Sequence, residues 1–427
     1  MTYKITKIKA LEILDSRGNP TVEVEIQAEK NKLFFKTEKI KAWAQVPSGS
    51  STGKFEAYEL RDEDENRFFG KGVLKVVQNI NNFLSKPLIG LDPTKQKEID
   101  NILINLDGTP NKNKLGANAI LAISMATARL GAIAKGIKLY EYISVLSNRE
   151  YKIPRPFFNI INGGLHAGNK IAFQEFMIAP NFKNFNDNYR AGSEIYHSLK
   201  NILKIKYGGE ATLLGDEGGF APNEINSPEE AFDLINEAVE KAGYEGKVDY
   251  AIDVAATSFF QNGKYNLGFK SENHNLKTTD QLIDTYLNLV EKYPIISIED
   301  PFDENDFQAF SKLKDKLKDK KVQIVGDDLT VTNPIRIKEA IKEKSCDSLL
   351  LKINQIGTIS EAIDSFKLAK ENNWFVMVSH RSCETNDDFI SDFATGIGSE
   401  QIKSGAPARG ERVAKYNRLL SIFLENK

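Results

Sequence analysis

Five ionisable residues in the second half of the chain each follow directly on a short, largely apolar run. They are three acids, a lysine and a histidine: Asp253, Glu299, Asp327, Lys352 and His380. Short apolar runs of this kind are typical of buried strands. We therefore expect successive strands to place three carboxylates, an amine and an imidazole at their downstream ends, aimed at one point.

The three acids Asp253, Glu299 and Asp327 together predict a magnesium site. A hard divalent cation takes oxygen ligands, accepts a few carboxylates and leaves its remaining positions to water and substrate. The alternative is that each carboxylate caps a helix or pairs with a base, but three acids on neighbouring strand ends favour the metal. Asp300 and Asp328 directly follow the second and third acids. Because side chains alternate along a strand, we expect only one member of each pair to point inward.

Lys352 lies inside an otherwise apolar run. A lysine in such a run usually extends its amine to the surface. At the mouth of a barrel beside divalent cations, however, burial and nearby positive charge would lower its pKa. A neutral amine is a competent general base. Because Lys352 is on the strand next after Asp327, we expect it to act as that base.

Further residues could complete such a site. If the fold brings Glu175 and Glu217 together, repulsion between the two carboxyls would keep one protonated near neutral pH and supply a general acid. Arg381 and Ser382, with Lys403 beyond them, could bind a phosphate by charge-assisted hydrogen bonds. The loop at 46–53 is rich in hydroxyls and contains two glycines, but it lacks the Lys-Ser/Thr ending of a Walker loop. It is either a surface turn or a lid.

The elements that must position these residues can be read from the second part of the chain. After residue 154 strand and helix patterns alternate, and N-cap signals at Ser227, Asn333 and Thr358 each open a helix. The five ionisable strand ends are separated by 46, 28, 25 and 28 residues, which suits one strand plus one returning helix. Such units close into a TIM-like α/β barrel, whose chemistry lies where the strands end. An open doubly wound sheet is the structural alternative.

The first part of the chain has a mixed pattern. Segment 21–26 alternates apolar and polar residues, as a half-exposed antiparallel strand does, and later segments turn helical. Segment 114–130 is rich in small apolar residues, which predicts a helix buried on most sides, where the two parts of the chain meet. We therefore expect a smaller α+β domain over residues 1–145, serving as a lid or cap, and a catalytic α/β barrel over residues 146–427.

Composition limits the class of protein. The 57 basic and 59 acidic side chains give no strong field of one sign, so neither nucleic acid nor an anionic membrane is expected as a partner. No stretch approaches the roughly 20 apolar residues that cross a bilayer. The N-terminus lacks the apolar core of a secretory signal, and two cysteines are too few for a disulfide framework. We therefore expect a soluble, cytoplasmic protein.

Nine motifs spread over nearly the whole chain resemble the enolase family. They are DSRGNPTVEVE at 15–25, PSGSSTG at 47–53, NGGLHAG at 162–168, GDEGGFAPN at 215–223, IEDPF at 298–302, DDLTVTNP at 327–334, LKINQIGT at 351–358, SHRS at 379–382 and IKSGAPAR at 402–409. The resemblance implies a glycolytic and gluconeogenic lyase that interconverts 2-phospho-D-glycerate with phosphoenolpyruvate and water. It also implies two magnesium ions per active site and a homodimer or higher homo-oligomer.

Carried over motif by motif, the resemblance implies a role for each site residue. Asp253, Glu299 and Asp327 would hold the first magnesium ion, and Ser51 would reach a second ion that arrives with substrate. Lys352 would take the proton from carbon 2, since this superfamily uses a lysine or histidine base with one or two magnesium ions. Glu217 would protonate the departing 3-hydroxyl, with Glu175 beside it. Arg381 and Ser382 would bind the phosphate, and Lys403 would bind the carboxylate. The substrate site would also be lined by Gln174, His166 and His380.

Some positions depart from the family pattern without replacing a proposed catalytic group. They are Ser50, Leu165, Thr257 with Ser258, Cys383, and a hairpin between 25 and 47 that is longer than usual. Two rival interpretations remain. A racemase or acid-sugar dehydratase of the same superfamily would share the carboxylates and the lysine, but the loop at Ser51 and the SHRS segment argue against it. A binding protein with an inactive barrel should have lost Lys352 or a metal carboxylate, and neither is missing.

Overall fold

The computed structural model describes residues 2–31, 37–49, 53–271 and 275–427. The N-terminal part begins with a three-stranded antiparallel sheet formed by β1 (Lys4–Leu14), β2 (Pro20–Asn31) and β3 (Thr37–Gln45). Val22, Val24 and Ile26 of β2 are buried, and the acids between them are partly exposed. This alternation confirms the half-exposed strand predicted at 21–26.

Four helices follow the sheet: α1 (Leu74–Asn79), α2 (Gln96–Asp107), α3 (Ala117–Lys135) and α4 (Leu139–Ser147). Helix α3 packs against β2 and β3 on one side and against α10 and α11 of the second part on the other. Its residues are buried almost throughout, which confirms the predicted helix at 114–130 and its place between the two parts. By length and composition α3 could cross a membrane, so the expectation that no stretch approaches that limit is wrong. Because 83% of the matching window is buried inside the protein, α3 is a core helix here.

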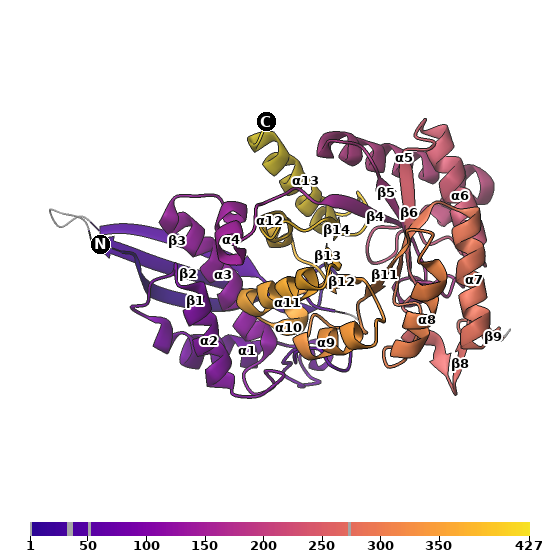
Figure 1. The fold of residues 1–427 in the computed structure, drawn as a ribbon. Coiled ribbons are helices and arrows are strands. Elements are labelled where there is room, and N and C mark those ends of the chain that lie inside the picture. The colour runs from indigo at the N-terminus through magenta and orange to yellow at the C-terminus, as the bar shows by residue number, and fades with distance from the viewer. Residues whose placement is uncertain (1, 32–36, 50–52, 272–274) are drawn as a thin grey trace.

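The second part is a closed eight-stranded barrel, which excludes the open-sheet alternative. Its strands are β4 (Arg155–Asn162), β5 (Glu175–Pro180), β6 (Val248–Asp253), β10 (Ile295–Glu299), β11 (Gln323–Gly326), β12 (Ser348–Leu351), β13 (Phe375–Ser379) and β14 (Gln401–Lys403). Seven apolar residues that alternate with outward-facing positions fill the interior: Phe157, Met177, Ala179, Ala251, Val325, Leu350 and Met377. Figure 1 shows the β1–β3 sheet at one end of the molecule and helices α5–α8 at the other.

The barrel departs from strict strand–helix alternation at its start. Residues 163–174 connect β4 to β5 without a returning α-helix, and β5 runs antiparallel to both β4 and β6. Two helices, α5 (Phe185–Tyr207) and α6 (Pro228–Lys241), then lead to β6. As a result, Glu175 begins its strand yet lies opposite Asn162 and Asp253, which end theirs.

The remaining helices cover the outside of the barrel. They are α7 (Thr279–Lys292), α8 (Phe307–Leu317), α9 (Pro334–Lys342), α10 (Ile353–Ile356), α11 (Ile359–Glu371), α12 (Phe389–Gly396) and α13 (Gly410–Glu425). The three predicted N-caps are confirmed, since side-chain oxygens of Ser227, Asn333 and Thr358 accept backbone N–H bonds at 3.2, 2.9 and 3.1 Å. A small antiparallel sheet of β7 (Phe260–Gln261), β8 (Lys264–Asn266) and β9 (Leu276–Lys277) follows β6.

Candidate active site

The predicted strand-end residues meet at one cavity of about 280 Å³ at the downstream end of the barrel. Its lining includes eleven of the residues singled out from the sequence: His166, Gln174, Glu175, Glu217, Asp253, Asp327, Lys352, His380, Arg381, Ser382 and Lys403. Glu299 is buried next to them and contacts Lys403. Ser51 falls outside the described residues. Gly53, which closes the 46–53 segment, lines the cavity as well.

Lys403, the last residue of β14, lies among three buried carboxylates. Its Nζ is 2.8 Å from both oxygens of Glu299, 3.2 Å from Glu175 Oε2 and 3.5 Å from Asp253 Oδ2. Burial alone would lower the pKa of Lys403, but the charges of Glu175, Glu299 and Asp253 outweigh it and raise that pKa well above its usual value. The lysine proposed for the substrate carboxylate therefore neutralises two of the proposed magnesium ligands.

Lys352 forms a second buried ion pair, and here an expectation from the sequence is corrected. Its Nζ donates to Asp327 Oδ2 at 2.5 Å, and Gln355 Nε2 donates to the other Asp327 oxygen at 2.9 Å. Burial acts to lower the pKa of Lys352, but the Asp327 carboxylate more than offsets it, so this pKa is raised rather than lowered. The predicted neutral amine is thus a charged partner of Asp327 in this structure.

The expectation that only one acid of each adjacent pair points inward is also wrong for Asp327 and Asp328, whereas of the other pair only Asp300 lines the cavity. Asp300, Asp327 and Asp328 all line the cavity, and one oxygen from each lies within 4.8 Å of the others. The alternation of side chains along a strand does not apply to these acids. Asp327 and Asp328 come after β11, which ends at Gly326, and Asp300 has a left-handed backbone with φ of 40°. Asp300 accepts the backbone N–H groups of Asp327 and Asp328 at 2.9 and 2.7 Å, so it braces the turn that carries them.

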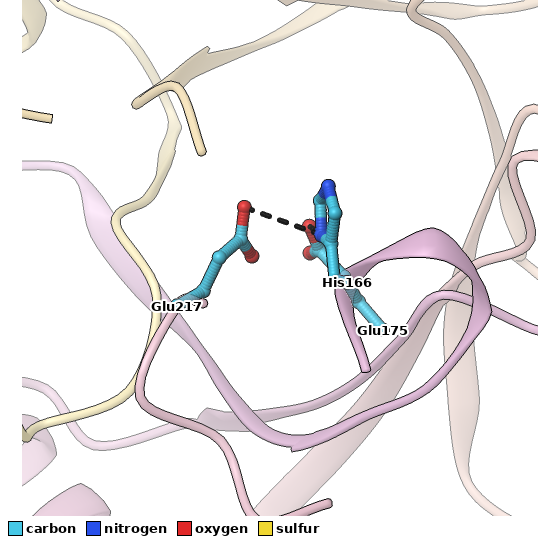
Figure 2. Close-up of side chains that lie close together, drawn as sticks. All are labelled: His166, Glu175 and Glu217. Atoms are coloured by element: carbon cyan, nitrogen blue, oxygen red, sulfur yellow. Dashed lines mark ion pairs between the residues drawn. The ribbon is translucent and has the colours of Figure 1, made fainter. Parts of the chain in front are cut away.

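Glu175 and Glu217 do come together, as the acid hypothesis requires. Figure 2 shows the Glu217 carboxyl pointing toward the His166 ring, with Glu175 beside it. His166 Nδ1 is 3.5 Å from Glu217 Oε1 and 4.0 Å from Glu175 Oε1. Burial, and then the neighbouring charge of Glu217, raise the pKa of Glu175 to about 7. Burial lowers the pKa of His166 to about 4, so the imidazole is neutral between the two acids.

Three residues that hold side chains of the site are among those that were not singled out from the sequence. Asn159, in the middle of β4, donates from Nδ2 to Glu217 Oε2 at 3.0 Å. Glu56 forms a buried ion pair with Arg381 at 2.8 Å, and Arg412 bonds His380. Asn159 could have been found from the sequence, because it is the polar residue inside the otherwise apolar segment 156–161. Glu56 and Arg412 have no local signal, because their partners are hundreds or tens of residues away.

Comparison with known families gives two matches along the chain. Residues 5–143 match the family described as "Enolase, N-terminal domain", and residues 150–426 match "Enolase, C-terminal TIM barrel domain". The two matches together cover nearly all of the 427 residues. The chain belongs to the enolase family.

The donor set of this enolase-family site fits a hard divalent cation. Glu299 and Asp253 lie opposite each other on β10 and β6, and their ligand atoms are all carboxylate oxygens. Burial, and then the charge of Asp253, raise the pKa of Glu299 well above its usual value. A group of buried acids that oppose one another's ionisation is stabilised by added positive charge, which a cation supplies.

Three of the positions that depart from the family pattern line this cavity, whereas Ser50 falls outside the described residues. Leu165 is 55% exposed beside His166, and Thr257 and Ser258 also line the cavity. The backbone of Cys383 exchanges two hydrogen bonds with Ser48, at 2.8 and 3.0 Å, so the start of the 46–53 loop is fixed to the segment that follows His380. Of the described loop residues, Ser48 is thus fixed to that segment and Gly53 lines the cavity.

Proposed function

We propose that this protein is a magnesium-dependent lyase that interconverts 2-phospho-D-glycerate with phosphoenolpyruvate and water. One observation carries the proposal: a single cavity is lined by a lysine, by a buried pair of glutamates and by carboxylates suited to a cation. Removal of a proton next to a carboxylate and loss of a hydroxyl from the neighbouring carbon need one base, one acid and concentrated positive charge. The family match supports this chemistry.

Asp253, Glu299 and Asp327 would hold the first magnesium ion, and Ser51 would contribute to a second. Magnesium, when bound, would neutralise the negative charge that develops beside the substrate carboxylate as the carbon 2 proton leaves. Lys352 would take that proton in its neutral form, so it must first release the Asp327 carboxylate that it contacts here.

Glu217 would protonate the departing 3-hydroxyl. Asn159 holds one of its oxygens, and His166 and His380 approach the other at 3.5 Å each, so the carboxyl has a fixed direction. Glu175, whose pKa is about 7, would share the proton of this pair. Arg381 and Ser382 would bind the phosphate, Lys403 the substrate carboxylate, and Gln174 would line the substrate site.

The direct test is the rise in ultraviolet absorbance as phosphoenolpyruvate forms from 2-phosphoglycerate. We expect turnover with magnesium and its loss in excess chelator, with recovery when magnesium is restored. Full turnover in chelator would contradict the metal assignment. Absence of phosphoenolpyruvate under all conditions, with exchange of an α-proton on another carboxylate substrate, would point to a racemase or acid-sugar dehydratase instead.

We also propose a cytoplasmic homodimer or larger homo-oligomer. Large apolar side chains on one face of the N-terminal sheet support an interface there, since Leu11 and Trp43 are 42% and 45% exposed. Both cysteines are buried free thiols, which suits a reducing compartment. Light scattering at micromolar concentration should give a multiple of 47.9 kDa, and the mass of a single chain would contradict this.

A further inference from the structure

Arg412 is the largest fully buried side chain of the protein's described residues, and it lies next to the cavity rather than in it. It stands in the first turn of α13, where a positive charge opposes the helix dipole. A buried guanidinium in such a position is costly unless its donors are satisfied. The groups that it contacts therefore indicate what it does.

The guanidinium joins two segments of the proposed active site. Nη1 donates to the Arg381 carbonyl at 2.6 Å, and Nη2 donates to the carbonyls of Ser382 and Asp216 at 2.7 and 3.3 Å. Asp216 directly precedes Glu217, and Arg381 directly follows His380. One side chain thus sets the distance between the segment of the proposed acid and the segment of the proposed phosphate site.

The fourth contact of the guanidinium determines the state of a histidine. Nη1 lies 2.5 Å from His380 Nδ1. An arginine has donors only and stays protonated, so His380 Nδ1 must accept and cannot itself carry a proton. The ring proton is then on Nε2. That atom is 3.5 Å from Glu217 Oε1, so Nε2 is the ring nitrogen next to the carboxyl.

We propose that Arg412 is a positioning residue that holds His380 neutral, in the tautomer with its proton on Nε2, so that His380 donates to Glu217. This inference rests on the proposed role of Glu217 as the acid. When Glu217 gives its proton to the leaving hydroxyl it becomes a carboxylate, and a hydrogen bond from Nε2–H stabilises that charged form. With the opposite tautomer, Nε2 would present a lone pair to the carboxylate and oppose the transfer.

The tautomer can be measured without any substrate. The chain has four histidines, so labelling with ¹³C,¹⁵N-histidine gives few signals, and a His380→Gln variant identifies the one of interest. We expect an unprotonated Nδ1 and a protonated Nε2 in the wild-type protein. In Arg412→Met, which removes the donors, we expect a mixture of tautomers. In Arg412→Lys, which keeps a donor, we expect the wild-type tautomer to be partly restored. A protonated Nδ1 in the wild type, or an unchanged tautomer in Arg412→Met, would overturn the proposal.

Kinetics then test the connection to Glu217. Arg412→Met should lower kcat about 100-fold, in the range of a lost contribution to general acid catalysis. In a His380→Gln background the same change should lower kcat by less than about threefold, because the group through which Arg412 acts is gone. Fully additive losses would overturn the proposal. Arg418→Met is the matched control, since Arg418 lies on the same helix and pairs with Asp392 away from the cavity. Absence of lyase activity in the wild type would refute the proposed function and leave the tautomer result standing.

Discussion

Replacing Glu175 by glutamine should change how the stability of the barrel depends on pH. The Glu175 carboxyl is 2% exposed, and burial followed by the charge of Glu217 raises its pKa from the ordinary 4.5 to about 7. Below pH 4.5 the group is protonated in both the folded and the unfolded chain. Between pH 4.5 and 7 the folded protein binds the proton more tightly, so stability is lost as pH rises and the loss is complete above about pH 7.

The size of this loss follows from the two pKa values. A difference of about 2.5 pH units corresponds to about 3 kcal/mol at full effect. A glutamine side chain at this position does not titrate, so Glu175→Gln should lack this contribution. The free energy of unfolding of the variant minus that of wild type should therefore be about 3 kcal/mol larger at pH 8 than at pH 4.

Urea unfolding in chelator can measure this difference through tryptophan fluorescence. The chain has two tryptophans, Trp43 on the N-terminal sheet and the buried Trp374 just before β13. A Trp43→Phe background therefore reports on the barrel. Glu224→Gln, at an exposed position, is the matched control and should behave as wild type at both pH values. If wild type and Glu175→Gln differ in free energy of unfolding by the same amount at pH 4 and pH 8, the pKa of Glu175 is not raised in the folded protein.

Two further predictions concern the acids of the site and a lysine that binds the backbone on either side of His166. Titration calorimetry should show magnesium binding weakened more than about tenfold in each of Asp253→Asn, Glu299→Gln and Asp327→Asn. In Asp328→Asn the affinity should stay within about threefold of wild type. The reverse ordering would show that the wrong acid was assigned to the cation. Burial lowers the pKa of Lys270 to about 8 while its ammonium donates to the carbonyls of Gly164 and Ala167 at 2.5 and 2.8 Å. Its acetylation by a trace reagent should therefore show a midpoint near pH 8, and a midpoint near pH 10, as for an ordinary lysine, would contradict this.

Much of the fold could be predicted because its signals are local. The helix starts at Ser227, Asn333 and Thr358 depend on a side chain and a backbone N–H two or three residues away, so the sequence carries both partners. The strand ends at Asp253 and Glu299 are marked by the change from apolar to acidic residues. The reversed direction of β5 was not predicted, because it depends on the short connection from β4 and on pairing with β6, far away in the sequence.

The site was predictable as a set of residues but not as a set of contacts. Lys352 was expected near Asp327, yet its pKa depends on a 2.5 Å contact that no spacing reveals. The adjacent acids at 327 and 328 both reach the cavity because the strand ends before them, and strand ends are the least certain part of any assignment from sequence. Arg412 contacts His380 across 32 residues of sequence, and its burial is visible only in three dimensions.

We propose that Lys352 acts on carbon 2 and Glu217 on the leaving hydroxyl, and isotope exchange separates these two roles. In heavy water, Glu217→Gln should exchange the carbon 2 proton of 2-phosphoglycerate while forming little phosphoenolpyruvate, because the base remains and the acid is gone. Lys352→Ala should do neither, and Lys338→Ala, at an exposed lysine of α9, should do both. Exchange by Lys352→Ala together with none by Glu217→Gln would contradict the account.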